Sequence, residues 1–297
     1  NVLKHFPEIG TLKTPWRWRN AGTEALGQWL LSSRVALLAG QPIDLHGAPP
    51  EVTWVQLAAD PNTAHRQRLE AARTKAPTTH GTVLVIGDST SPNGQQQIAS
   101  QTPGATTVEA ADLRDLTTFG RSFDPASPNA LKTLVGFATG LMTNLGAAEL
   151  HRRVETLTKG NGGKEATARE AAVMAFRATP SIRTALEAMR ALEDAPDVRV
   201  YRPEVLHVCK AAMQAAATGE CSFYEAIIRA RERNRHLGRL TTRRAVGSTL
   251  LLKGLEADVA VVLNPADMNA RNLYVALTRG AKKLVVCSRT ATLTPAR

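Results

Sequence analysis

Short aliphatic runs alternate with longer stretches of helical spacing in the first and last parts of the chain. Four runs are short, nearly uninterrupted and apolar, which predicts buried strands of a parallel sheet; they lie at 52–57 (VTWVQL), 82–88 (TVLVIGD), 257–264 (ADVAVVLN) and 283–288 (KLVVCS). Between residues 21 and 40, leucines, a valine and a tryptophan recur at roughly helical spacing. Strands that alternate with helices predict an α/β layer.

The middle of the chain has helical periodicity instead. Helices are predicted over 130–154 and over 221–237. A further helix is predicted over SIRTALEAMRALED (181–194), with Thr179 as its N-cap and Pro180 in the first helical position. The only run there that resembles a strand is VRVY at 198–201, and GNGGKE at 160–165 is typical of a linker. This change of pattern predicts a second, mostly helical unit.

The simplest organisation is a discontinuous α/β domain with a helical insertion. We expect the α/β domain to comprise residues 1–120 and 240–297, and the insertion to comprise residues 121–239. The chain opens on Asn1, and its first residues are typical of the middle of a domain. We therefore expect it to be a fragment of a longer protein.

Composition adds a preference for a polyanionic partner. Lys and Arg number 37 against 26 Asp and Glu, so the formal charge is +11 and the pI is about 10.1. This balance favours nucleic acid, although a merely basic soluble protein also fits. The three cysteines lie far apart without a CxxC pair, which predicts neither disulfides nor a zinc site and fits a reducing cytoplasm. Neither a signal peptide nor an apolar run of the ~18–20 residues that a membrane span needs is present.

Two short motifs near the end of the chain carry the functional signal. KGLE (253–256) precedes one predicted strand, and LYVALTRG (273–280) precedes the next. Arg279 lies between the predicted end of a helix and a buried strand. Burial of a guanidinium there costs free energy unless an anion pairs with it. In this order and context, the pair resembles the last two motifs of UvrD/Rep-like superfamily 1 DNA helicases. The resemblance covers about 1–60 and 240–297 and implies a RecA-like parallel sheet flanked by helices, with a mostly α-helical insertion.

The first residues resemble a further motif of the same family. HFPEIGTLKTPWRWRN (5–20) is similar to a family segment that leads from "FP" to an aromatic–arginine pair. In that family the aromatic ring stacks on adenine and the arginine reaches the γ-phosphate. Two pairs compete here, Trp16-Arg17 and Trp18-Arg19; the spacing from Leu12 favours the first, and the serine that usually follows is absent from both.

The resemblance implies a role for each matching residue. Arg279 would be an arginine finger that stabilises charge on the γ-phosphate in phosphoryl transfer, with Arg17 as its partner. Glu256 would hydrogen-bond the ribose, and Tyr274 and Thr278 would set the helix that carries Arg279. The expected nucleotide-binding residues are Glu256, Gly254, Trp16, Arg19 and Tyr274, and the expected contacts to the DNA backbone are Lys253, Ser248, Thr249 and Thr278.

The sequence also departs from the family. Leu250 occupies the position, three residues before the KGLE lysine, where members usually have a histidine that couples DNA to nucleotide. A phosphate loop of the form GxxxxGK[ST] and an acidic magnesium motif are both missing from these residues. ATP with Mg²⁺ is the expected cofactor, and the resemblance implies that an N-terminal RecA-like domain of the same protein supplies the Mg²⁺ ligands.

The sequence therefore predicts the C-terminal motor half of an ATP-dependent DNA helicase or translocase, inactive alone and acting on single-stranded DNA or a DNA junction, as in DNA repair. One alternative is a nucleic-acid-binding module without an ATPase role, and another is a helical scaffold.

Simpler interpretations also exist for single residues: a surface salt bridge for Arg279, an exposed charge for Glu256, core packing for the tryptophans, and a strand start for Ser248 and Thr249. An arginine-rich segment could follow a DNA strand or form a solvated helix face; it contains Arg229, Arg231, Arg233, Arg235, Arg239 and Arg243.

Overall fold

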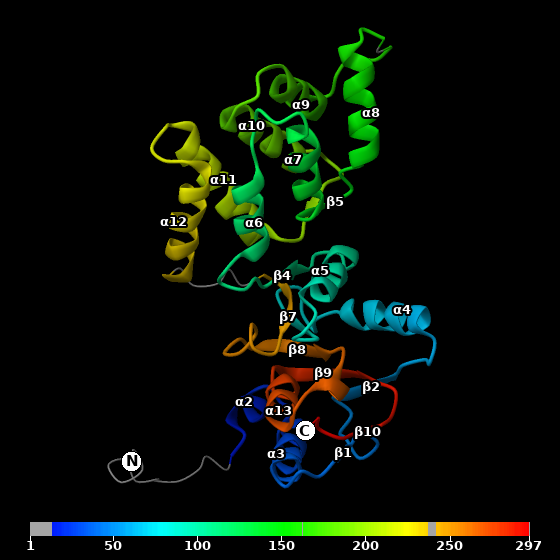
Figure 1. Ribbon diagram of the computed structural model, residues 1–297. Helices are drawn as coiled ribbons and strands as arrows, with labels where there is room; N and C mark the ends of the chain where they lie inside the picture. Colours follow the sequence, from blue (N-terminus) through cyan, green and yellow to red (C-terminus); the bar gives the residue numbers. More distant parts are fainter. Residues whose placement is uncertain (1–13, 162, 237–241, 297) are drawn as a thin grey trace, which may run out of the picture. The chain divides into compact units, whose positions relative to one another are not determined.

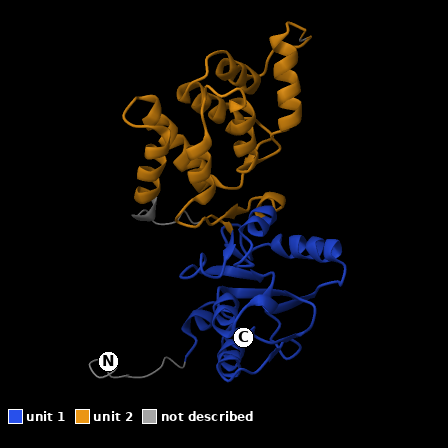
Figure 2. Cartoon of the chain, viewed as in Figure 1, with its two compact units in different colours: residues 1–98, 246–297 blue, residues 99–245 orange. Residues whose placement is uncertain are grey.

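The chain folds into two compact units (Figures 1 and 2). The computed structural model describes residues 14–161, 163–236 and 242–296. The first unit, here called the α/β unit, comprises residues 1–98 and 246–297, and the second, the helical unit, comprises residues 99–245. The α/β unit is discontinuous in sequence. Its first segment ends at residue 98 rather than near 120, and its second begins at residue 246 rather than 240.

A six-stranded sheet provides the frame of the α/β fold. In spatial order its strands are β2 (Val52–Gln56), β9 (Gly280–Ser288), β8 (Ala257–Val262), β3 (Val83–Gly87), β7 (Arg244–Ser248) and β4 (Thr106–Thr107). Strands β2, β9, β8 and β3 run parallel to one another. Every residue of β3 is buried, as expected of an aliphatic strand covered on both faces. The four predicted strands and the predicted α/β class, a RecA-like parallel sheet flanked by helices, are confirmed.

Helices and a small two-stranded antiparallel sheet complete the α/β unit. They are α2 (Trp16–Asn20), α3 (Glu24–Leu38), β1 (Ile43–Asp44), α4 (Pro61–Ala72), α5 (Pro92–Gln101), the 3₁₀ turn η1 (Pro265–Asp267), α13 (Ala270–Leu277) and β10 (Thr292–Leu293). Helix α5 spans the first boundary between the units, and β1 pairs with β10 in an antiparallel manner. Helix α13 packs against β8 and α3, whereas α4 packs against β9.

Two crossovers run across the sheet in opposite directions. From β2 the chain passes through α4 to β3, and from β8 it passes through α13 back to β9. Because crossovers between parallel strands are right-handed, opposite directions place α4 and α13 on opposite faces of the sheet. Both helices begin at side-chain caps: Asp60 accepts a hydrogen bond from the Thr63 amide (2.7 Å), and Asn269 accepts one from the Asn272 amide (2.9 Å).

The helical unit is built from seven longer helices and short bridging strands in the part of the chain that the structure describes. These elements are α6 (Arg114–Ser122), α7 (Ala130–Thr139), β5 (Met142–Thr143), α8 (Ala147–Thr158), α9 (Ala168–Ala178), α10 (Ile182–Glu193), β6 (Arg199–Val200), α11 (Pro203–Ala217) and α12 (Phe223–His236). Strands β5 and β6 pair in an antiparallel manner. None of the described helices is both long and apolar enough to cross a membrane.

Two details of the predicted helices are wrong. The single helix predicted over 130–154 is broken between α7 and α8, where Asn144 and Gly146 adopt left-handed φ values of 63° and 58° that end helical geometry. Helix α10 is not capped by Thr179: its N-cap is Ser181, which forms a reciprocal capping box with Thr184.

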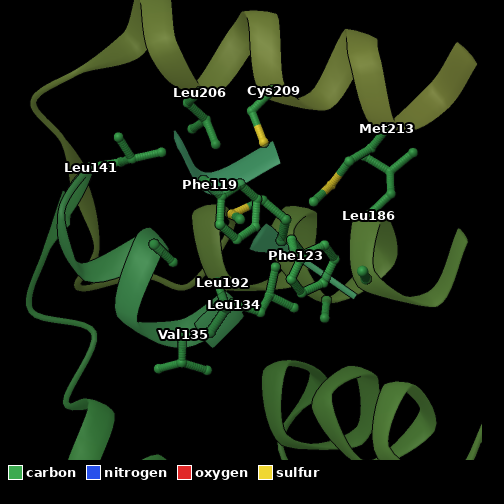
Figure 3. Packing of buried hydrophobic residues seen from close by; sticks show 14 of the residues in the cluster. Phe119, Phe123, Leu134, Val135, Leu141, Leu186, Leu192, Leu206, Cys209 and Met213 are labelled. Atoms are coloured by element: carbon green, nitrogen blue, oxygen red, sulfur yellow. The ribbon is translucent and has the colours of Figure 1, made fainter. Parts of the chain in front are cut away.

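Aromatic and aliphatic side chains fill the core of the helical unit (Figure 3). Phe119 of α6 stacks on Phe137 of α7 with ring centroids 4.0 Å apart, and on Phe123 at 4.8 Å. Figure 3 shows Leu206, Cys209 and other side chains of α11 converging on the same cluster. All four tryptophans of the sequence, by contrast, lie in the α/β unit. The helical unit therefore has its own core and its own aromatic content.

Candidate nucleotide and DNA site

Arg279 lies in the two-residue connection between α13 and β9, as the sequence predicts. Its guanidinium donates through Nε to the Val275 carbonyl (2.9 Å) and through Nη1 to the Leu255 carbonyl (3.0 Å). Nη2 also donates to Thr278 Oγ1 (3.3 Å). The side chain is half-buried, and burial, followed by the positive charge of Arg17, lowers the pKa of Arg279. Its described hydrogen bonds thus go to neutral groups rather than to a carboxylate.

Hydrogen bonds join the two motifs that the sequence predicts to act together. Besides the bond from Arg279 to the Leu255 carbonyl, the Ala257 amide donates to the Arg279 carbonyl (3.0 Å). KGLE and LTRG therefore meet at the amino ends of the neighbouring strands β8 and β9. In a parallel sheet these ends lie at the same edge, which we call the amino edge.

Arg17 reaches the same place from α2. Its Nη1 donates to the Thr278 carbonyl (2.6 Å), and its Nη2 forms an ion pair with Glu256. The side chains of Arg17 and Glu256 are 28% and 52% exposed, so solvent reaches both partners. Arg17, Glu256, Thr278 and Arg279 form a group that we call the arginine cluster. It holds two guanidiniums and one carboxylate.

The two competing aromatic–arginine pairs have different environments. Trp18 is buried, and its indole Nε1 donates to the Gly280 carbonyl (3.0 Å). Trp16 is 53% exposed, and the guanidinium of Arg19 lies 5.3 Å from its ring centre. The structure therefore places Arg17 in the arginine cluster, with its guanidinium 5.0 Å from the ring centre of Trp18, and leaves Arg19 outside the cluster. Core packing is the role of Trp18.

Thr278 and Gly280 shape the connection that carries Arg279. The Thr278 hydroxyl donates to the Tyr274 carbonyl (3.0 Å), so it closes the last turn of α13, while the half-buried Tyr274 lies one turn earlier. A Cβ at position 280 would approach the Lys283 carbonyl oxygen to 2.5 Å and the Ala260 nitrogen to 2.8 Å. Only glycine fits there without a shift of the backbone. This packing requirement was not assigned from the sequence, because it depends on the neighbouring strand.

The KGLE turn presents its lysine and glutamate to solvent. Gly254 has a φ of +87°, a conformation that L-amino acids with side chains rarely adopt, which explains a glycine at this position. Lys253 and Glu256 are exposed on either side of it, whereas Leu252 is fully buried and anchors the turn.

Ser248 and Thr249, predicted to contact DNA, are buried. The Ser248 hydroxyl accepts a hydrogen bond from the Leu251 amide (3.3 Å), and the Thr249 hydroxyl lies 3.9 Å from the sulfur of Met268. Leu250 is 74% exposed between these residues and Lys253. The surface of this turn is therefore formed by Leu250 and Lys253 rather than by the two hydroxyls.

The arginine-rich segment belongs to the helical unit and lies partly outside the described residues. Arg229 and Arg233 are exposed on α12, and Arg231 pairs with Glu232 (2.9 Å). Nothing is described of Arg239 or of the side chain of Arg235.

In the three described ranges, no group of three or more His, Cys, Asp or Glu residues is arranged to hold a metal ion. No protein-family model and no curated protein matches the chain.

Proposed function

We propose that this chain is the second RecA-like motor domain, with its helical insertion, of an ATP-dependent DNA helicase or translocase. The observation that supports the proposal is the arginine cluster at the amino edge of the sheet. Arg17 and Arg279 come from segments more than 250 residues apart, yet both donate to groups of the same short connection. Such convergence of two guanidiniums with one carboxylate is suited to an anionic substrate.

Charge balance makes the terminal phosphates of a nucleotide a suitable occupant. Two guanidiniums face one carboxylate, so the cluster carries one uncompensated positive charge at a half-buried position. A planar guanidinium matches phosphate oxygens and stabilises the charge that spreads over the γ-phosphate during transfer. Arg279 would be the arginine finger, and Arg17 would exchange its Glu256 partner for the phosphate.

The neighbouring groups suit the rest of a nucleotide. Glu256, once released by Arg17, would accept hydrogen bonds from the ribose hydroxyls. The exposed ring of Trp16 would provide a stacking surface for adenine, held in place by Arg19. Bound Mg²⁺ would neutralise phosphate charge, and its ligands, with the phosphate loop, would belong to a first RecA-like domain of the same protein.

The DNA contacts are proposed at the KGLE turn, which adjoins the arginine cluster. Lys253 is exposed there and can pair with a phosphate without reading sequence. Because Ser248 and Thr249 are buried, we assign the contact to Lys253 and the backbone of the turn. The formal charge of +11 favours a polyanion, and the three free cysteines fit a cytoplasmic protein.

A second candidate is a nucleic-acid-binding module without an ATPase role. Two observations favour it: Arg279 already donates to three internal acceptors, and Leu250 replaces the histidine that couples DNA to nucleotide in the family that the sequence resembles. This candidate predicts DNA binding that does not respond to ATP, whereas the motor domain predicts DNA binding and ATP hydrolysis that depend on each other.

The test adds a RecA-like domain that carries a phosphate loop and Mg²⁺ ligands, and measures ATP hydrolysis with and without single-stranded DNA. We expect DNA-stimulated hydrolysis that falls by a factor of about 10³ or more in Arg279→Ala, the range observed for arginine fingers. Arg271→Ala is the matched control, because Arg271 is an exposed arginine on α13, the helix that immediately precedes Arg279.

Two further measurements separate the outcomes. Tryptophan fluorescence during unfolding reports whether Arg279→Ala still folds, and anisotropy of a labelled oligonucleotide reports DNA binding, which we expect to be retained. A folded Arg279→Ala variant with normal DNA-stimulated turnover contradicts the finger assignment. DNA binding without any ATP hydrolysis or ATP response supports the second candidate instead.

A further inference from the structure

A cavity opens at the opposite edge of the sheet from the arginine cluster. Its volume is about 500 Å³, and it is lined by residues that follow β2, β8 and β9, together with Arg68 of α4. Because these strands run parallel, their carboxyl ends meet at one edge, which we call the carboxyl edge. The cavity therefore lies at the far end of the strands from Arg279 and shares none of the residues of the arginine cluster.

The topology of the sheet explains why a cavity forms there. The chain leaves β2 toward α4 on one face and leaves β8 toward α13 on the other, with β9 between them. The connections after β2 and β8 therefore diverge and leave a crevice above the end of β9. In open α/β sheets, such a point of divergence at the carboxyl ends is the place where ligands bind.

The cavity combines an apolar floor with charged walls. Leu57, Leu263 and Leu293 are buried residues of its lining. Arg68 is half-buried and donates through Nε to the Leu263 carbonyl (3.2 Å), while Arg289 and Asp267 are exposed at the rim. A few polar groups above an apolar floor are typical of small-molecule sites, which have volumes of roughly 300–1,000 Å³.

The charges of the walls are not balanced among the described lining residues. Burial lowers the pKa of Arg68; the neighbouring charge of Arg289 lowers it further, and Asp267 opposes this effect. The lining thus holds two guanidiniums against one carboxylate. The side-chain oxygen of Asn264, another lining residue, is buried and has no hydrogen-bond partner among the described residues. Unused polar groups at a cavity are exceptions that call for a functional explanation.

The rim is held in shape by its own hydrogen bonds. The Ser288 hydroxyl donates to the Thr290 carbonyl (2.7 Å) and accepts a bond from the Trp54 indole (2.9 Å), and the Thr290 hydroxyl donates to the Thr292 carbonyl (2.9 Å). Strand β10 is further tied to β1. These bonds fix the segment that carries Arg289, so the site is formed before a ligand arrives, which limits the entropy lost on binding.

We infer that this cavity is a second ligand site, distinct from the arginine cluster, that binds a small phosphate ester. Arg68 and Arg289, which come from different elements, engage different oxygens of the tetrahedral phosphate, and the body of the ester covers the leucine floor. A tetrahedral group offers oxygens in several directions, whereas a planar carboxylate offers two in one plane, so two separated guanidiniums favour phosphate. The inference is independent of the proposed ATPase role.

Binding of ribose 5-phosphate to the purified chain, measured by calorimetry at low salt, tests this site. We expect saturable binding that weakens by about 10- to 100-fold in Arg289→Gln, the loss of one charge-assisted contact. Arg289 is exposed, so this variant should fold; Arg68→Lys, which keeps the charge and loses the planar fork, should weaken binding as well. Arg66→Gln, an exposed arginine on the same helix outside the cavity, is the matched control.

Two probe ligands and one distant variant complete the design. Ribose, without the phosphate, should not bind, and inorganic phosphate should bind more weakly because it leaves the floor uncovered. Arg17→Gln should leave ribose 5-phosphate binding unchanged, so failure of the nucleotide proposal and failure of this one can be told apart. The inference is overturned by absent saturable binding at millimolar ligand, by wild-type affinity in Arg289→Gln, or by equal binding of ribose or inorganic phosphate.

Discussion

Each of the two units contains an arginine that is partly or fully buried. The arginine of the helical unit pairs with carboxylates, whereas the arginine of the α/β unit has neutral acceptors. In the helical unit, Arg202 is 4% exposed and forms a bidentate pair with Glu109 (2.8 Å to each oxygen) and a third bond to Asp115 (2.7 Å). Burial alone would lower the pKa of Arg202, but the bonds and charges of Glu109 and Asp115 raise it overall. In the α/β unit, Arg279 has neutral acceptors and another arginine beside it.

A third arginine shows which part of this difference matters. Arg199 of the helical unit also donates only to carbonyls in its described bonds, those of Ala99, Ser100 and Ala105 (2.6–3.0 Å), and burial lowers its pKa. Its acceptors lie at or just after the end of α5, where the carbonyls of a helix carry partial negative charge. Arg279 binds the end of α13 in a similar way. Neutral acceptors alone therefore indicate a helix cap, and the second guanidinium, Arg17, distinguishes the arginine cluster.

The comparison teaches that two neighbouring guanidiniums with too few carboxylates, rather than neutral acceptors alone, separate a candidate functional arginine from a structural one. Arg202 carries its counter-charges within the unit, so an added anion would find no free charge there. The arginine cluster holds one more guanidinium than carboxylate, and the carboxyl-edge cavity has the same excess, with Arg68 and Arg289 against Asp267. Both sites of the α/β unit are therefore suited to receive an anion that the fold does not supply.

Removal of Arg202 should give the largest loss of stability. Arg202→Ala leaves the buried carboxylate of Glu109 without its partner, which typically costs about 3–5 kcal/mol. Hydrogen exchange of the amides in α10 and α11 measures the helical unit, and tryptophan fluorescence measures the α/β unit, because all four tryptophans lie there. Exchange should accelerate while the fluorescence transition in urea stays unchanged.

Arg114→Ala is the matched control for that variant. Arg114 is 86% exposed and lies 3.9 Å from Asp112, a geometry that contributes less than about 1 kcal/mol. Equal effects of the two substitutions would show that the Arg202 network does not stabilise the helical unit. A shift of the fluorescence transition in Arg202→Ala would show that the two units unfold together.

An intermediate effect is expected at Gly280, the first residue of β9, next to Arg279 of the arginine cluster. Gly280→Ala places a Cβ against backbone atoms of Lys283 and Ala260 that cannot move cheaply, and such overpacking costs about 1–3 kcal/mol. The fluorescence transition in urea should move to lower denaturant. Gly136 lies at an exposed position in the middle of α7, with no atom within 4 Å of an added Cβ. Gly136→Ala should therefore stabilise the helical unit by about 0.5–1 kcal/mol.

The strands could be predicted from the sequence because their signal is local, whereas the residues of the arginine cluster were expected only from the resemblance of three short segments to family motifs. Buried parallel strands are almost wholly aliphatic, and the residues of KGLE and LTRG lie within two short segments. The break between α7 and α8 was missed because Leu141, Met142 and Leu145 continue the helical spacing of apolar residues through a segment that is not helical. Helices α4 and α5 have few apolar positions, so their periodicity gave no signal.

The carboxyl-edge cavity could not be predicted at all. Its walls come from three separate segments, around residue 57 and α4, then 263–267, then 287–294, and only the strand order brings them together. The hydrogen bond from Arg17 to the Thr278 carbonyl could likewise not be predicted, because every residue has a carbonyl and residue type does not show which one accepts. The burial of Ser248 and Thr249 depends on how the turn before Leu252 folds back, which the residue types do not specify.

The smallest predicted effect concerns the charge of a buried cap in the helical unit. Burial tends to raise the pKa of Glu170, but hydrogen bonds from Thr167 and Arg153 outweigh it and hold that pKa below its ordinary value of 4.5. A carboxylate with a lowered folded-state pKa stabilises the fold above its unfolded-state pKa, and this contribution is lost as the pH falls through the folded-state value. Protection of the amides of α9 should therefore fall more steeply below about pH 4.5 in the wild type than in Glu170→Gln, which keeps the capping geometry without the charge. Parallel pH profiles for the two proteins would show that the charge of Glu170, unlike that of Glu109, does not contribute to the stability of the helical unit.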